Sequence, residues 1–421
     1  MLGGLAAAVL FVGCGGEGAR NTNIQAMPRP EQPWILETPA AQRGKLFVRP
    51  TPGEVATLNT LVSEDVSSTE AIALFMRALV GYDRQKDEIV PALATDWKVS
   101  DSGKVWYFTL REGVYWSDGH PFDADDVLFS FEARYDDRYP TRDADYLSIN
   151  RKPYTVSKIN ERTIKVVTAE VHGSFLLTML GATILPEHKL RPAFEDGTLL
   201  QTWNLEMAYN NPGEIVSLGP YVLESYTPGE RLTFIRNPNF YGETDDGLAL
   251  PLTERVIVAI QKDINAATAA FSQGFFDASL NVIPPGDVGW VKRTEERFDF
   301  SVKDLGPSPS TNFFWFNMNP GKDADGKPYV APHKLKWFTD KRFRQAVSYG
   351  LDRQGIVDSV LFGRGYPAYN PVTKANRKWH NPDIKRYPYN PDKARALLRE
   401  AGFRREGNGP LTDADGNEVA F

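Results

Sequence analysis

Residues 115–132 read YWSDGHPFDADDVLFSFE, and this run marks the end of one element and the start of the next. Trp116 ends a stretch of alternating polar and apolar residues, and Gly119 in the following turn can adopt a positive φ angle. Asp123 suits the cap of a helix, because its carboxylate can accept backbone N–H groups of the first turn. We therefore predict a turn at 117–120 and a helix that begins after Asp123.

The acids of this run fit the same helix start. Asp126 lies three residues after Asp123 and can accept a bond from the backbone N–H of that cap, as in a capping box. Phe122 before the cap and Val127 at the fourth helical position suit a hydrophobic staple. Asp125 and Asp126 also complement the positive end of the helix dipole, each by about 0.3–1 kcal/mol.

Two chemical interpretations compete with this structural one. Asp118 and Asp126 could serve as the acid and the nucleophile of a hydrolase, a pair that needs about 5–10 Å between its carboxyl groups. His120 and Asp118 could bind a metal, but a spacing of two matches no strong ligand pattern and the other histidines are scattered. Since each acid from 123 to 126 already has a structural role, we predict no catalytic residue, metal or cofactor here.

Hairpin signals recur along the first 260 residues. Apolar residues alternate with polar ones on both sides of short runs rich in Asn, Asp, Ser, Pro and Gly. This pattern predicts a first strand at 44–50 and hairpins at 92–113, 149–170 and 219–237.

Helical periodicity is more frequent beyond residue 260. Apolar residues at helical spacing predict helices at 263–274, 339–363 and 390–403 in this part of the chain, and one earlier helix at 67–83. Asp263 and Asn390 are the expected N-caps, and Asp352 is expected to restart the 339–363 helix after Gly350. An apolar run at 311–320 predicts one more strand. The fold class is therefore α/β in the mixed α+β sense.

The N-terminus reads as a secretion signal. The apolar run from Leu2 to Val12 is shorter than the about 20 residues that span a bilayer, and small residues follow it. Phe11-Val12-Gly13-Cys14 is similar to a bacterial lipobox, which predicts a lipid on Cys14. Two features depart from that pattern. Phe11 stands where Leu is preferred, and the absence of basic residues before Leu2 indicates a start codon further upstream.

Cys14 is the only cysteine, so no internal disulfide can form and stability must come from burial. One acyl chain binds a membrane only marginally, so a stable anchor implies at least two chains on this residue. The Gly- and Pro-rich residues 15–43 are predicted to be a flexible tether. A net charge of −6, with acids and bases interspersed, argues against nucleic-acid binding.

Residues 97–132 closely resemble the signature region of family 5 extracellular solute-binding proteins, the peptide- and oligopeptide-binding subunits of bacterial ABC importers. The resemblance continues in order along residues 44–421. Its other segments are 78–97, 217–243, 260–279, 316–368 and 391–403.

The resemblance implies a two-lobed, periplasmic-binding-protein-like fold with an extra subdomain on the first lobe. We expect a signal peptide at 1–14, the tether at 15–43, a first lobe at 44–305 with its subdomain at about 66–215, and a partial second lobe at 306–421. The chain stops at LTDADGNEVAF, with a turn predicted at 413–416, where the family continues. We therefore expect a fragment or a truncated gene, an incomplete second lobe, poor ligand binding and aggregation.

The implied function is capture of di- or oligopeptides and delivery to an ABC permease and its ATPase subunits. The protein would be a monomer in the periplasm or at the outer face of the cytoplasmic membrane, held there by its lipid, and would not be an enzyme. Within this receptor class an oligosaccharide, a nickel chelate or an opine remains an alternative ligand. A secreted or surface hydrolase with paired carboxylates is the alternative from another class.

Ligand contacts are predicted in three places. The predicted contacts are Glu64, Asp65 and Val66 in loop 61–70, Tyr146 in the extra subdomain, and Tyr369, Asn370 and Trp379 in loop 365–379. Each place also has a structural alternative. These alternatives are helix capping by Ser67 or Ser68 in loop 61–70, simple packing of Tyr146, and a plain surface loop at 365–379.

Overall fold

The computed structural model describes residues 18–21, 24–38, 42–84, 86–279 and 283–420. The chain forms two compact units, the first ending at Ile283 and the second beginning at Pro284. The predicted lipidation site, Cys14, lies outside the described residues.

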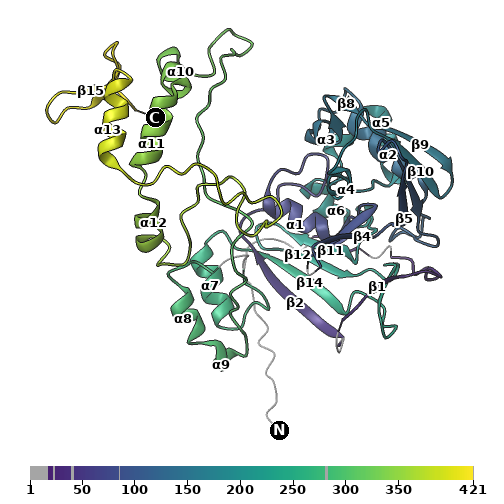
Figure 1. Ribbon diagram of the computed structural model, residues 1–421. Helices are drawn as coiled ribbons and strands as arrows, with labels where there is room; N and C mark the ends of the chain where they lie inside the picture. The colour runs from purple at the N-terminus through teal and green to yellow at the C-terminus, as the bar shows by residue number, and fades with distance from the viewer. Residues whose placement is uncertain (1–17, 22–23, 39–41, 85, 280–282, 421) are drawn as a thin grey trace. The chain divides into compact units, whose positions relative to one another are not determined.

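The central sheet of unit 1 has the strand order β11-β12-β14-β2 (Figure 1). β2 (Gly44–Thr51) and β14 (Thr253–Ile260) pair in parallel, although about 200 residues separate them in sequence. β12 (Arg231–Arg236) joins β14 and β11 (Tyr221–Thr227) with antiparallel pairing. The helices α1 (Val66–Phe75) and α6 (Leu205–Asn210) contact β11.

A second sheet, with the order β5-β6-β10-β9, carries the extra helices of unit 1. β5 (Ala94–Val99) and β6 (Val105–Leu110) form one hairpin, and β9 (Thr155–Asn160) and β10 (Thr163–Val167) form another. On one face the apolar residues of β6 and β10 are buried, because successive side chains of a strand alternate between faces. α2 (Ala124–Tyr135) contacts β9 and the helix α5 (Glu187–Asp196).

Shorter elements complete unit 1. One buried apolar cluster extends through it and includes the fully buried Trp116, Phe75 and Phe234. The shorter elements are β1 (Trp34–Leu36), β3 (Val80–Asp83), β4 (Glu88–Pro91), α3 (Arg142–Tyr146), β7 (Ser148–Ile149), β8 (Lys152–Pro153), α4 (Phe175–Met179), η1 (Leu199–Gln201), η2 (Pro212–Glu214), β13 (Gly242–Thr244) and α7 (Ile264–Ser272).

Unit 2 is mainly helical. Its core is a small aromatic cluster in which Phe343 is 1% exposed and contacts Trp337 and Phe403. Its elements are α8 (Val288–Lys292), α9 (Glu295–Phe298), α10 (Pro332–Thr339), α11 (Lys341–Gly350), α12 (Arg353–Ser359), α13 (Pro391–Glu400), β15 (Arg404–Arg405) and β16 (Leu411–Thr412). Among the described residues of the chain, no helix combines the length and apolar character needed to cross a bilayer.

The helix starts predicted from capping residues are confirmed. Asp123 and Asp126 form a capping box at the start of α2. Asp263, Asp352 and Asn390 each accept a backbone N–H in the first turn of α7, α12 and α13. The three hairpins are confirmed as well, with their strands at β5–β6, β9–β10 and β11–β12.

Two predicted elements are wrong. The 67–83 helix ends at Phe75, and Gly81 lies inside β3, because residues from Val80 onward pair with β4 instead. The 311–320 run is not a strand in the structure, although the consecutive aromatic residues 313–316 make it strongly apolar. Phe316 packs on the aromatic cluster of unit 2, whereas Trp315 is 73% exposed. A strand needs a neighbouring backbone to bond with, and this run has none among the described residues.

The expected tether is also corrected where it is described. We call residues 18–21 and 24–36 the N-terminal strap. It is bound along unit 1, because the N–H groups of Ala19, Gln25 and Trp34 donate to carbonyls of Tyr209, Ser117 and Tyr241. The buried Arg111 donates to the carbonyl of Gln32, and β1 pairs in parallel with β13. Backbone bonding therefore outweighs the Gly- and Pro-rich composition that predicted a free segment.

Candidate functional site

Loop 61–66 leads into α1. Some of its side chains hold the start of the helix, and others are exposed to solvent. Asp65 is the N-cap of α1, since its Oδ1 accepts the N–H of Ser68 at 2.7 Å. The hydroxyl of Ser68 accepts the N–H groups of Ala56 and Thr57 at 2.9 and 3.2 Å. Asp65, rather than Ser67 or Ser68, therefore caps the helix, and its carboxylate is occupied.

The two neighbours of Asp65 are exposed. Glu64 is exposed and Val66 is 58% exposed, although Val66 is the first residue of a helix whose other face is buried. A carboxylate and an apolar side chain are thus presented to solvent beside each other. This part of the loop can contact a ligand without disturbing the fold.

Tyr146 lies at the end of α3 and is 55% exposed. Its ring packs against Gly181, where an added Cβ would lie 3.3 Å from the Cε1 atom of the tyrosine. Two residues further on, the hydroxyl of Thr183 lies 3.0 Å from that of Thr60, which directly precedes loop 61–66. The segment 181–183 therefore connects Tyr146 to the loop that carries Glu64 and Val66.

A buried polar stripe on α2 positions this connecting segment. Asp126, Ser130 and Arg134 are spaced four residues apart, so they share one face of the helix, and they are 1–2% exposed. Arg134 Nη2 donates to the carbonyl of Thr183 at 2.8 Å, Ser130 Oγ accepts the N–H of Leu185 at 2.7 Å, and Asp126 Oδ1 accepts that of Glu187 at 2.9 Å. The stripe therefore binds the backbone at every second residue from 183 to 187.

Arg134 also holds α3, which carries Tyr146. Its Nε donates to Asp143 Oδ2 on α3 at 3.0 Å. Burial lowers the pKa of this guanidinium, and the charge and hydrogen bond of Asp143 act in the opposite direction. Arg134 is a positioning residue that sequence reasoning missed. The available signal was the i, i+4, i+8 spacing of the polar residues 126, 130 and 134 within an otherwise apolar helix face.

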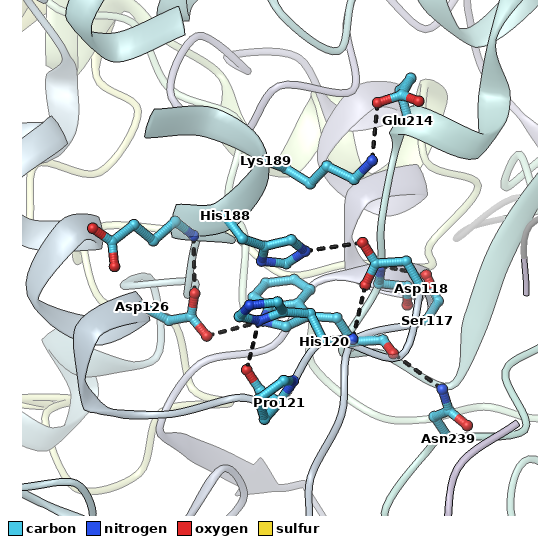
Figure 2. A network of polar contacts seen from close by, with 12 residues as sticks. Ser117, Asp118, His120, Pro121, Asp126, His188, Lys189, Glu214 and Asn239 are labelled. Carbon is cyan, nitrogen blue, oxygen red and sulfur yellow. Dashed lines mark hydrogen bonds and ion pairs between the residues drawn. The ribbon is translucent and has the colours of Figure 1, made fainter. Parts of the chain in front are cut away.

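Asp118 and Asp126, the two acids considered for catalysis, both form hydrogen bonds within the fold (Figure 2). Asp126 accepts hydrogen bonds from Trp116 Nε1, at 2.9 Å, and from the N–H groups of Glu187 and Asp123. Burial raises its pKa to about 7 in spite of these donors. Asp118 accepts a bond from His188 Nε2 at 2.9 Å, and burial, which would raise its pKa, is outweighed by this and neighbouring contacts that lower it.

A group of three acids has the spacing of a metal site. Ligand oxygens of Asp123, Asp125 and Glu161 lie within 4.8 Å of one another. The ammonium of Lys158 lies 2.7 Å from Asp125 and 2.9 Å from Glu161, and these hydrogen bonds raise the pKa of the lysine. The lysine supplies the cation for this group, so its geometry needs no metal ion to explain it.

In unit 2 the predicted contacts lie on the loop between α12 and α13. Asn370 is used internally, since its Nδ2 donates to the carbonyl of Asn381 at 2.6 Å and its Oδ1 accepts the N–H of Val372. The guanidinium of Arg353 lies 5.0 Å from the ring centre of Tyr369. Trp379 is 62% exposed. Of these three residues, Trp379 is the one that presents a large free surface.

Four of the seven predicted contacts lie in unit 1, and the segment 181–183 links Tyr146 to the loop that carries the other three of these four. Glu64, Val66 and Tyr146 have exposed side chains, and Asp65 fixes the helix start between them. The other three share one loop of unit 2. Whether any of the seven binds a ligand stays a prediction.

Comparison with known proteins identifies the family. Residues 88–419 match the model described as "Bacterial extracellular solute-binding proteins, family 5 Middle". The chain is 28% identical to a "Probable ABC transporter-binding protein" of Deinococcus radiodurans over 92% of its own length and 65% of that protein. It is 27% identical to the "Dipeptide-binding protein" of Escherichia coli K12, over 80% of its length and 59% of that protein. The chain therefore spans less than two thirds of these relatives.

Solved structures show the same fold. The oligopeptide-binding protein AppA of Bacillus subtilis, solved with a nonapeptide, matches with a TM-score of 0.70 and 24% identity, over 90% of this chain and 68% of that one. MelB of Agrobacterium fabrum, solved with stachyose, matches with a TM-score of 0.73 and 20% identity, over 91% and 60%. The predicted mixed α/β fold of periplasmic binding proteins is confirmed. Because the family model matches well over half of the residues, the chain belongs to family 5 of the bacterial extracellular solute-binding proteins.

Proposed function

We propose that the protein is the substrate-binding subunit of an ABC importer and that its ligands are di- or oligopeptides. The observation that carries this proposal is the exposed group of Glu64, Val66 and Tyr146 in a chain of this family. A free peptide offers an ammonium for Glu64, and apolar surface for Val66 and the tyrosine ring. The E. coli relative named as a dipeptide-binding protein supports the same ligand class.

The mechanism is capture without covalent chemistry. A ligand that touches two lobes stabilises the closed form in proportion to its preference for that form. We propose that the first lobe covers residues 44–305 and the second begins at 306, a boundary close to the division between the two compact units. A permease with its ATPase subunits would then take the solute from the closed receptor. We also keep the monomeric state and the lipid anchor on Cys14 as proposals.

Equilibrium dialysis at high protein concentration, with mass-spectrometric quantitation of solutes, tests the ligand class. The probes are Ala-Ala-Ala, the trisaccharide raffinose, a nickel–histidine complex and an opine. We expect weak but measurable retention of the peptide, with unchanged mass and above that of the other three probes. Retention of another probe alone would replace the peptide by that ligand class, and cleavage of any probe would favour a hydrolase.

Variants connect the binding to the candidate site. Tyr146→Ala and Glu64→Gln should each lower peptide retention several-fold, because one contact is worth about 1 kcal/mol. Tyr107→Ala is the matched control, since Tyr107 is a partly exposed tyrosine on β6, outside the site. Equal retention by Tyr146→Ala and Tyr107→Ala would remove Tyr146 from the site.

A further inference from the structure

The turn at 117–120 holds two stacked imidazoles. The rings of His120 and His188 are 3.9 Å apart at their centroids and nearly parallel, with 8° between their planes (Figure 2). Nδ1 of His120 lies 3.0 Å from the carbonyl oxygen of Pro121, which can only accept, so this nitrogen carries a hydrogen. Nε2 of His188 faces the carboxylate of Asp118 and carries a hydrogen for the same reason.

These contacts leave one nitrogen of each ring to take a proton. Nδ1 of His188 is buried and has no hydrogen-bond partner in the described part of the chain. A proton there would create a buried N–H without an acceptor, whereas Nε2 of the exposed His120 can be protonated from solvent. If both rings are protonated, two like charges stand about one ring spacing apart. Repulsion between these charges would act to push the two rings apart.

The same turn holds the N-terminal strap. The carbonyl of Ser117 accepts the N–H of Gln25 at 3.2 Å. Asn239 links the strap to the residue before the turn. Its Nδ2 donates to the carbonyls of Gln25 in the strap and of Trp116, and its Oδ1 accepts the N–H of Met27 in the strap. Gly119 lies directly beneath the strap, because a Cβ there would meet the side chain of Gln25 at 2.9 Å. A change in this turn is therefore transmitted to the strap.

We propose that the stacked imidazoles of His120 and His188 form an acid-sensitive clamp that holds the strap on the 117–120 turn at neutral pH and loosens it in acid. Entry of the second proton separates the rings, which moves His120 and with it the turn that binds Gln25. Other charged groups surround the stack. They are Asp118 on the turn, Glu187 and Lys189 on α5, Asp123 and Asp126 at the start of α2, and Glu214, which pairs with Lys189 at 3.0 Å.

Hydrogen–deuterium exchange of the whole chain at pH 8 and pH 5 tests the clamp. After correction for intrinsic exchange rates, protection of peptides covering residues 24–28 should fall at least about tenfold in acid. Peptides covering Trp34, whose N–H binds Tyr241 away from the turn, should keep their protection and serve as the internal control. Equal protection of residues 24–28 at the two pH values would overturn the proposal.

The double variant His120→Gln/His188→Gln assigns the effect to the imidazoles. Glutamine can still donate to Asp118 but does not titrate, so the strap should stay protected at both pH values. If the double variant loses as much protection in acid as the wild type, the surrounding carboxylates are responsible and the clamp is contradicted. If the double variant does not fold, His120→Gln alone decides, because one remaining imidazole cannot form a pair of like charges.

Discussion

Replacing Arg134 by methionine should destabilise unit 1 by about 2–4 kcal/mol. The guanidinium is 1% exposed and donates to the carbonyls of Ser130 and Thr183 and to Asp143. Hydrogen bonds from a charged donor contribute about 1.5–3 kcal/mol each, and the two to carbonyls give about 3–6 kcal/mol. Burying methionine in place of the desolvated cation returns about 1–2 kcal/mol of this loss.

Urea unfolding followed by tryptophan fluorescence and a thermal melt measure this effect. Unfolding entropy of about 2.1 cal/mol/K per residue gives about 0.6 kcal/mol/K for a unit of this size, so the midpoint should fall by about 3–7 °C. Amide exchange should also quicken at residues 183–185, which Arg134 and Ser130 hold.

An exposed ion pair in the same unit is the matched control. Arg162 pairs with Glu112, and their side chains are 47% and 65% exposed, so Arg162→Met should cost no more than about 1 kcal/mol. Two results would refute the reasoning. One is an Arg134→Met variant as stable as the Arg162→Met variant, and the other is a destabilised variant whose exchange at residues 183–185 is unchanged.

Three further predictions concern Asp126, Gly119 and Phe343. Burial raises the pKa of Asp126 to about 7 from 3.8, so its contribution to stability is complete below about pH 4 and is lost as pH rises through 7. The unfolding free energy of Asp126→Asn, measured in urea at pH 5 and pH 8, should lack this decline. Gly119→Ala should lower the melting temperature more than Gly197→Ala. Both glycines have φ near +87°, at +88° and +86°, but the space around Gly197 is open; equal losses would mean that the strap does not press on Gly119. In unit 2, Phe343→Ala should cost about 3–5 kcal/mol of unfolding free energy, whereas Trp315→Ala, at an exposed position, should cost less than about 1 kcal/mol.

Local signals in the sequence were sufficient for helix starts and hairpins. Asp123, Asp263 and Asn390 each cap the helix that follows them, because a cap depends on residues within one turn. The hairpins were predictable for the same reason, since a short turn joins strands that are adjacent in the chain. The wrong end of the 67–83 helix arose where antiparallel pairing of Val80 with Pro91, in a hairpin that was not predicted, overrode helical spacing.

The candidate site depends on partners that are far apart in sequence. The contact of Arg134 with Thr183 joins residues 49 positions apart, and the strap binds Asn239 across more than 200. No local pattern specifies such partners, although the spacing of Asp126, Ser130 and Arg134 marked a polar stripe. Glu64 and Tyr146 were assigned from the family resemblance, and their exposure is what the structure adds.

Peptide retention by the wild-type chain and by Tyr146→Ala, measured side by side in equilibrium dialysis, tests the proposed function most directly. The wild type should retain Ala-Ala-Ala with unchanged mass, and Tyr146→Ala should retain several-fold less while Tyr107→Ala matches the wild type. Failure of the wild type to retain the peptide while it binds or cleaves another probe would contradict the account.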